Sequence, residues 1–215
     1  MTERFAIYFA PAADSVLQRA ATAWLARPEL QDATVSARRY GFHATLKAPM
    51  RLAAGGDRPA LASALADFAA HHRAVALRHL APRPIEAFLA LTTEPQSQAL
   101  TDFAADVVRA FEPFRAPLSA AERARRLTAP LTARQSELVD LYGYPYVLEQ
   151  FQFHMTLTDR LPAARQAAVR VEAEAWFAAA LAVPIQLDRL VLFREAQPGA
   201  PFERLEDFEL SGGAA

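Results

Sequence analysis

The order of hydrophobic and polar positions along the chain predicts a mixture of short strands and helices. Runs rich in β-forming residues predict strands at residues 4–9, 42–50, 75–80, 87–92, 150–158, 185–193 and 202–210. Helical stretches bounded by capping residues or prolines predict helices at residues 15–26, 59–71, 98–111 and 162–182. Because hairpins alternate with helical connections, the pattern predicts an α+β fold with mostly antiparallel sheets.

The segment between the two halves of the chain differs in character. Residues 115–141 contain Pro117, Pro130 and a charged cluster, with two short helical stretches that begin near Ser119 and Thr132. We interpret this segment as a helical insertion within a single domain that spans residues 1–215. It separates a first lobe, about 1–114, from a second lobe, about 142–210, and each lobe contains a strand–helix–strand unit.

One short phrase occurs in both halves. Phe-His-Ala-Thr-Leu at residues 42–46 returns as Phe-His-Met-Thr-Leu at residues 153–157. Two of the chain's 5 histidines would share this setting by chance on the order of once per million shuffled sequences. The repeat therefore predicts a duplicated half-site, in which two lobes related by a pseudo-twofold axis each place one histidine in a central cleft.

The spacing within the repeat indicates acid–base chemistry. Side chains alternate between the faces of a strand, so His43, Thr45 and Lys47 are predicted to share one face, as are His154 and Thr156. One neutral histidine can accept a proton while the other donates one. The threonine hydroxyls are candidates to bind phosphate oxygens. Lys47, the sole lysine of the chain, is a candidate point charge for the same phosphate.

Composition narrows the classes of partner and cofactor. The 215-residue chain has a net charge of −1, which indicates no global positive field for DNA. It has no cysteine, which excludes disulfides, thiolate metal ligands and cysteine nucleophiles. Neither motif strand places Asp or Glu beside its histidine, so we expect no metal and no cofactor. With no apolar leader or span in the sequence, we expect a cytoplasmic protein that has no membrane partner.

Other polar residues have plainer explanations. We interpret the arginines at 38–39 and within 123–126 as solvated charged faces, because Glu122 interrupts the second cluster and the net charge is slightly negative. Tyr8, on the first predicted strand, faces either the cleft or the core. These residues are therefore not assigned to the site from the sequence.

The motifs resemble a known family. Residues 39–49 read Arg-Tyr-Gly-Phe-His-Ala-Thr-Leu-Lys-Ala-Pro, and residues 143–146 read Gly-Tyr-Pro-Tyr. With the second motif at 153–158 and Pro-Gly-Ala-Pro-Phe at 198–202, they resemble the two-histidine (2H) phosphoesterase superfamily. More closely, they are similar to a bacterial branch of it that is associated with phosphonate-utilisation operons.

This resemblance implies a bilobal fold around a central cleft and metal-independent phosphoester chemistry. It makes His43 and His154 the catalytic pair and Thr45 and Thr156 the phosphate ligands. The resemblance also places three further residues in the branch's pattern, and they are candidates for substrate binding: Tyr40, Lys47 and Tyr144.

The expected function is therefore that of a hydrolase, a 2H-type cyclic phosphodiesterase that acts on a small cyclic phosphate or phosphodiester, nucleotide-derived or from phosphonate metabolism. Two alternatives stay open. The cleft is instead a non-catalytic binding module for a nucleotide or an RNA end, or it serves a transferase or ligase in which an alcohol replaces water. The motifs do not identify the substrate, and they do not show which histidine is the base and which is the acid.

Overall fold

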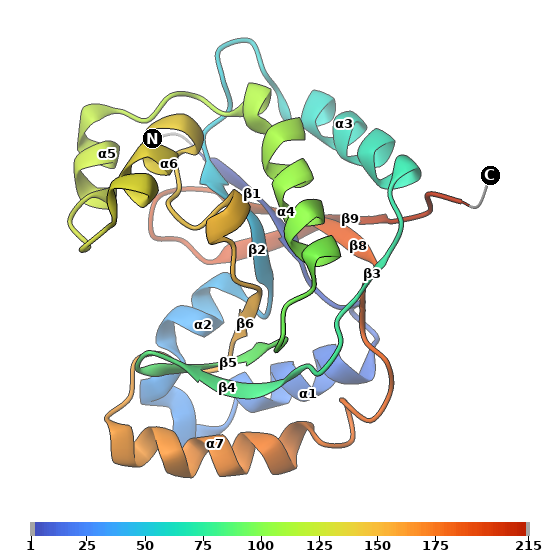
Figure 1. Cartoon of the computed structure of the whole chain (residues 1–215), viewed down its shortest axis with the longest axis vertical. Helices are drawn as coiled ribbons and strands as arrows, with labels where there is room; N and C mark the ends of the chain where they lie inside the picture. The colour runs from blue at the N-terminus through green and yellow to red at the C-terminus, as the bar shows by residue number, and fades with distance from the viewer. Residues whose placement is uncertain (1–2, 214–215) are drawn as a thin grey trace.

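The computed structural model of the chain describes residues 3–213 and shows an α+β fold with antiparallel sheets (Figure 1). The largest sheet has the order β2-β1-β8-β9, formed by β1 (Arg4–Phe9), β2 (Ala44–Met50), β8 (Arg189–Glu195) and β9 (Phe202–Glu209). A second sheet has the order β4-β5-β6, formed by β4 (Ala81–Ile85), β5 (Phe88–Thr92) and β6 (His154–Thr156). Two short strands, β3 (Val75–Ala76) and β7 (Gln186–Leu187), pair with each other.

Helices cover both sheets. They are α1 (Val16–Leu25), α2 (Val35–Tyr40), α3 (Arg58–His71), α4 (Gln98–Ala110), α5 (Ala120–Arg126), α6 (Ala133–Tyr142) and α7 (Ala163–Phe177). Three 3-10 turns complete the set, η1 (Pro28–Ala33), η2 (Glu112–Phe114) and η3 (Leu148–Gln150). Helix α7 packs on β4 and β5 with α1 beside it, whereas α3 contacts β8 and β9 and α4 contacts β2. Helices α5 and α6 project together at one end of the molecule (Figure 1).

Side-chain caps explain where the helices begin. The Ser15 hydroxyl accepts a hydrogen bond from the Gln18 amide at the start of α1, and Ser97 does the same at the start of α4. In the predicted insertion, α5 follows Ser119 and α6 follows Thr132, and both helices have complete capping boxes. The two helix starts expected in residues 115–141 are thus confirmed.

The apolar halves of the two motifs are part of the core. Phe42, Leu46, Phe153 and Leu157 are all buried, and Phe153 packs on Phe9 with ring centroids 6.2 Å apart. Burying each of these side chains contributes roughly 1.5–3 kcal/mol. The motif strands are therefore held by their apolar side chains, while the histidines and threonines of the motifs are only partly buried.

Several predicted boundaries are wrong. The strand expected at 150–158 covers only His154–Thr156, the one at 75–80 only Val75–Ala76, and the one at 185–193 is divided into β7 and β8. Helix α2 and strand β4 were not predicted. Strand β4 contains Pro82 and Pro84, which weaken a strand pattern, and it is tolerated because it lies at the edge of its sheet.

The strand pairing differs from a division into sequential lobes. Strands β8 and β9 complete the sheet of β1 and β2, and β6 joins β4 and β5. Each of these sheets therefore takes strands from both halves of the chain, so a first lobe of 1–114 and a second of 142–210 do not match the sheets. In this arrangement the two motif strands, β2 and β6, each lie at the edge of their sheet. They contact each other at the centre of the molecule (Figure 1).

Candidate functional site

Both motif histidines make the same local hydrogen bond. His43 Nδ1 lies 2.9 Å from the Gly41 carbonyl oxygen, and His154 Nδ1 lies 2.9 Å from the Gln152 carbonyl oxygen. Because a carbonyl oxygen only accepts, Nδ1 carries the hydrogen of each neutral ring and Nε2 is left as the proton acceptor. Gly41 ends α2 with φ 75°, a left-handed conformation that favours glycine and shapes the turn before His43. The repeated sequence therefore sets the same tautomer twice.

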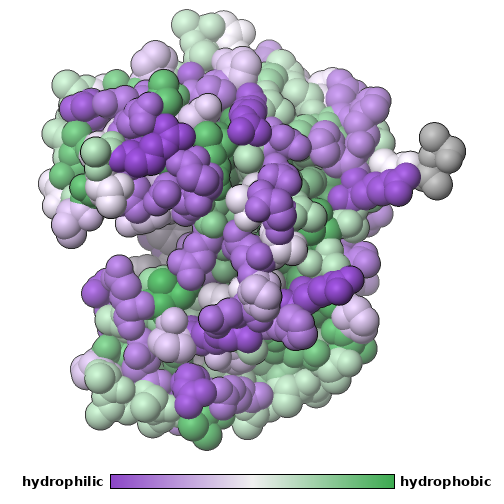
Figure 2. Space-filling model, viewed as in Figure 1, coloured by the Kyte–Doolittle hydropathy of each residue, from purple (hydrophilic) through white to green (hydrophobic). Residues whose placement is uncertain are grey.

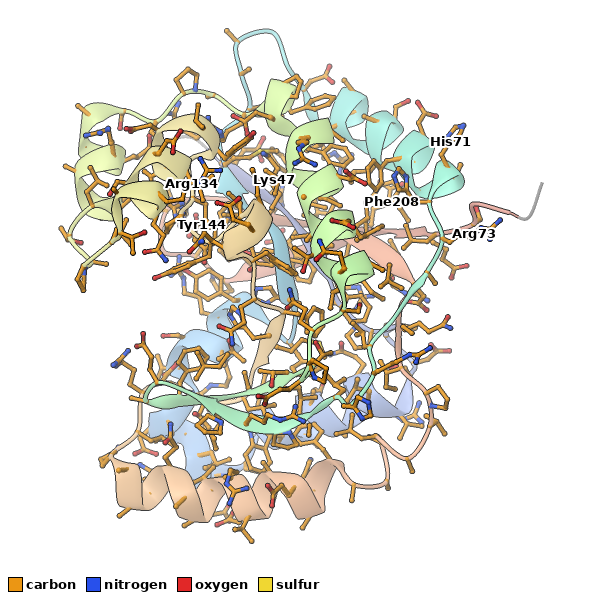
Figure 3. The ribbon with its side chains drawn as sticks, viewed as in Figure 1. Lys47, His71, Arg73, Arg134, Tyr144 and Phe208 are labelled. Carbon is orange, nitrogen blue, oxygen red and sulfur yellow. The ribbon has the colours of Figure 1, made fainter. Side chains whose placement is uncertain are left out.

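The two strands open into one cleft of about 870 Å³. Its lining includes all the sequence-predicted site residues except Lys47: Tyr40, His43, Thr45, Tyr144, His154 and Thr156. Figure 2 shows a hollow between the part of the surface formed by the insertion helices and the part below it. Figure 3 shows Tyr144 at the base of those helices. Residues from distant parts of the chain thus share one cavity.

The surroundings of His43 make it a weak base in the free protein. Its ring stacks on that of Tyr8, with centroids 3.8 Å apart, and its Nε2 is 3.3 Å from the Thr45 hydroxyl. Burial lowers the pKa of His43 to about 4, although the Gly41 carbonyl raises it, and the charge of His154 lowers it further. Burial also lowers the pKa of His154, which the Gln152 carbonyl partly offsets. Both rings are therefore neutral at pH 7.

Lys47 does not line the cleft, contrary to the face predicted for it. Its ammonium group is 2.7 Å from a Glu112 carboxylate oxygen and 3.1 Å from the Val108 carbonyl oxygen, and the residue is 3% exposed. Thr45 pairs with Tyr8, but Lys47 pairs with the adjacent Ile7, so a bulge interrupts the alternation of β2. Lys47 consequently turns away from the face of His43 and Thr45.

The cleft also contains arginines. Its lining includes Arg4, Arg39, Arg51, Arg125 and Arg126, so the interpretation of the arginine clusters as wholly solvated faces is wrong. For Arg39, the sequence did contain a signal that it belongs to the cleft, because it lies only four residues before His43. The cluster within 123–126 offers no such signal, since only the fold of the insertion turns it to the cleft.

A buried carboxylate holds part of this arginine wall. Glu195 is 0% exposed and accepts hydrogen bonds from the guanidinium groups of Arg4 and Arg39 and from the Gly199 amide. Burial opposes its ionisation, but these donors together lower the pKa of Glu195. The ionised carboxylate therefore positions two arginines and the turn at Gly199 beside the cleft.

Two structural findings bear on partners and cofactors. Within residues 3–213, no group of three or more His, Cys, Asp or Glu side chains is arranged to hold a metal ion. None of the helices in this described span is long and apolar enough to cross a membrane. The polar side chains that line the cleft carry imidazole, hydroxyl and guanidinium groups, together with the carboxylate of Glu122.

Comparisons with known proteins give three findings. A family model described as "Protein of unknown function (DUF1045)" matches residues 45–203. A protein of Janthinobacterium sp. (strain Marseille) named "Ribose 1,5-bisphosphate phosphokinase PhnN" is 41% identical over 97% of this chain and 51% of its own length. A protein of the same name from Laribacter hongkongensis (strain HLHK9) is 32% identical over 93% of this chain and 50% of its own length. This chain thus spans about half the length of these curated relatives.

A solved structure supports the fold. The crystal structure of TT0787 of Thermus thermophilus matches with a TM-score of 0.52 and 17% identity, over 98% of this chain and 100% of that one. At this identity the match concerns the arrangement of the elements alone.

The names of the curated relatives correct the predicted enzyme class. Both are named as a phosphokinase, an enzyme that transfers a phosphoryl group to an acceptor other than water. The sequence-based prediction of a hydrolase, a 2H-type cyclic phosphodiesterase, is contradicted by these names.

Proposed function

The chain belongs to the DUF1045 family, and because the description of that family names no activity, we propose a function from the cleft itself. The cleft carries out phosphoester transfer between hydroxyl groups of small phosphorylated sugars, with His43 and His154 as the acid–base pair and no metal ion required. The observation that carries the proposal is the pair of histidines with matching Nδ1 hydrogen bonds that line one cavity with two threonines. The resemblance of the motifs to the 2H superfamily also supports this use of the cleft.

The proposed reaction needs one proton to be removed and one to be supplied. His43 Nε2 accepts the proton of the attacking sugar hydroxyl, whose oxygen forms a new bond to phosphorus. The phosphorus–oxygen bond to the leaving group breaks, and His154 donates the proton that the leaving oxygen takes up. Each such proton transfer typically accelerates a reaction about 10²- to 10⁴-fold.

The pKa values favour this assignment of roles. His43, with a pKa of about 4, is held neutral and is ready to accept a proton. His154 has a pKa lowered by burial, and the negative charge of a bound phosphate raises it again, so His154 binds a proton together with the substrate. Thr45 and Thr156 then donate hydrogen bonds to the non-bridging oxygens, where negative charge is present in the transition state.

The substrate class is a small sugar phosphodiester or cyclic phosphate. The names of the curated relatives refer to ribose 1,5-bisphosphate, and the cleft has room and arginines for a phosphorylated sugar. The resemblance to a branch associated with phosphonate-utilisation operons supports a substrate that arises in phosphonate metabolism.

This chain is not suited to the nucleotide-binding part of a kinase reaction. Its sequence contains no Gly-x₄-Gly-Lys-Ser/Thr loop, the motif that binds nucleotide phosphates in many kinases. Its sole lysine, Lys47, is buried against Glu112. We therefore assign the named kinase activity of the relatives to the part of those proteins that this chain does not match.

The test is a transfer assay followed by ³¹P NMR. Donors are a panel of ribose cyclic phosphates and 2′,3′-cyclic nucleotides, the acceptor is ribose, and excess EDTA is present. We expect transfer by the wild type, loss of transfer in His43→Ala and in His154→Ala, and no loss in the control His71→Ala, whose ring is exposed on α3.

Three outcomes would overturn the proposal. Transfer that persists in either folded histidine variant removes the acid–base pair. Transfer abolished by EDTA in the wild type indicates a metal-dependent reaction. Saturable binding of the donors without turnover identifies the cleft as a binding module.

A further inference from the structure

We propose that Arg125 and Arg126, on the insertion helix α5, form a second anion-binding site in the cleft, so that the substrate has a phosphate group besides the one between the histidines. The inference rests on the proposed function only for the phosphate that binds between the two histidines. The second site is argued from the partners of the arginines, from the surroundings of Arg126 and from the position of α5.

Three of the cleft arginines already have a carboxylate partner. Arg4 and Arg39 share the buried Glu195, and Arg51 lies 3.0 Å from Glu122. The Arg51 guanidinium lowers the pKa of Glu122 to about 2 despite some burial, so this pair is fully ionised and self-compensating. These three arginines face two carboxylates, so Arg51 is fully compensated and the pair around Glu195 keeps one net positive charge.

Arg125 and Arg126 differ from them. Within residues 3–213, neither guanidinium lies within 4.0 Å of a carboxylate oxygen, although both line the cleft. Arg123, on the same helix, is instead exposed and bound to Asp140 at 2.6 Å. The uncompensated charge of α5 thus lies on the side that faces the cavity.

The surroundings of Arg126 favour an anion. Its guanidinium lies over the ring of Tyr144, 5.3 Å from the centroid, and is half-buried. Burial lowers the pKa of Arg126, and the positive charges of Arg4 and Arg125 lower it further. A bound phosphate strongly stabilises a partly dehydrated guanidinium that lies beside other positive charges. The phosphate supplies both the opposite charge and paired acceptor oxygens.

The two proposed sites line the same cleft but are built from different elements. The histidine site comes from the edge strands β2 and β6, whereas Arg125 and Arg126 come from the last turn of α5. Tyr40 lines the same cleft, and its ring lies 6.2 Å from that of His43. A small sugar with two phosphates fits this arrangement, one phosphate at each end.

Helix α5 itself depends on few interior contacts. None of its side chains, all in the described part of the chain, is buried. Ion pairs at Glu122 and Arg123 hold it to its neighbours. Neutral substitutions of its two cleft arginines are therefore expected to leave the fold intact, which makes the site accessible to mutation.

The experiment compares the affinity of ribose 1,5-bisphosphate with that of ribose 5-phosphate by isothermal titration calorimetry in EDTA. The wild type is expected to bind the bisphosphate about 10- to 100-fold more tightly, the range of one set of charge-assisted hydrogen bonds. In Arg126→Gln combined with Arg125→Gln, this ratio is expected to fall to about one. The control Arg58→Gln, at an exposed arginine of α3 that does not line the cleft, keeps the wild-type ratio.

The outcomes separate this inference from the proposed function. A wild-type ratio near one, or a ratio that survives in the double variant, overturns the second site. A ratio that falls to about one in the double variant but not in the control supports the second site. This holds even if the transfer assay shows no transfer and so contradicts the proposed reaction. Thermal unfolding of each variant checks that the fold is unchanged, and Arg126→Lys, which keeps the charge, is expected to recover part of the ratio.

Discussion

His43 directly precedes β2, a seven-residue strand, and its ring stacks on that of Tyr8 and lies 6.3 Å from that of Phe193 between centroids. In β6, His154 begins a strand of three residues, and its aromatic neighbour Phe88 meets it edge-on at 6.0 Å. The five-residue sequence around both histidines is nearly the same, and so is the Nδ1 hydrogen bond. The difference lies in what the rest of the protein packs against each ring.

This comparison separates two levels of control. A carbonyl two residues earlier in the chain sets the tautomer, so a local repeat is enough to duplicate it. The pKa depends on desolvation and neighbouring charge, which come from other strands. Two copies of one motif can therefore act as unlike partners, one as proton acceptor and one as proton donor.

The largest effect is expected from removing the imidazoles. His43→Ala and His154→Ala should each lower the transfer rate about 10²- to 10⁴-fold, because each removes one proton transfer. The double variant should be little worse than the poorer single variant, because both groups act in the same transition state. Initial rates from ³¹P NMR measure this. Strictly multiplicative losses would indicate that the two rings act in separate steps.

The threonines test whether the two half-sites contribute equally to phosphate binding. Thr45→Val and Thr156→Val should each lower the transfer rate about 10- to 100-fold, the cost of one hydrogen bond to a charged oxygen. Similar losses support a symmetric phosphate site between the strands. A loss confined to one variant would show that only one half-site contacts the phosphate. The same rate assay serves, with Thr22→Val on α1 as the control far from the cleft.

The positions four residues after each histidine extend the comparison to stability. Lys47 donates to Val108 and Glu112, and the hydroxyl of Thr158 accepts a hydrogen bond from the Leu89 amide. Lys47→Met should lower the free energy of unfolding by about 2–3 kcal/mol and Thr158→Val by about 1–2 kcal/mol, because each leaves a buried polar group unpaired. Denaturant unfolding measures both. If Lys47→Met keeps its stability but loses affinity for a sugar phosphate, Lys47 instead contributes to substrate binding.

The last prediction concerns the pH dependence of stability. The pKa of His43 is about 4 in the folded protein and near 6.5 when unfolded, so the unfolded chain binds more protons between these values. The free energy of unfolding contributed by His43 is complete above pH 6.5 and falls as the pH drops toward 4. His43→Gln should remove this contribution. Unfolding curves at pH 7.5, 5.5 and 4.5 show it as a flatter slope, and an unchanged slope would contradict the lowered pKa.

Local features of this protein were determined by the sequence alone. The strand at residues 4–9, the helix caps at Ser15 and Ser119 and the apolar faces of the two motifs all depend on neighbours a few residues away. The same holds for the tautomer of His43, whose partner is only two residues away. Such interactions are encoded within a short window, so periodicity and capping residues reveal them.

The tertiary structure decided pairing, electrostatics and the composition of the cleft. Nothing in the local pattern indicates that β8 and β9 complete the first sheet, or that a bulge turns Lys47 away from Thr45. The same is true of Arg126, which sequence reasoning placed in solvent and the insertion places over Tyr144. The pairing of strands, the burial of a side chain and its charged neighbours all depend on residues that are far apart in the chain. The interactions that determine them form only when the core is packed.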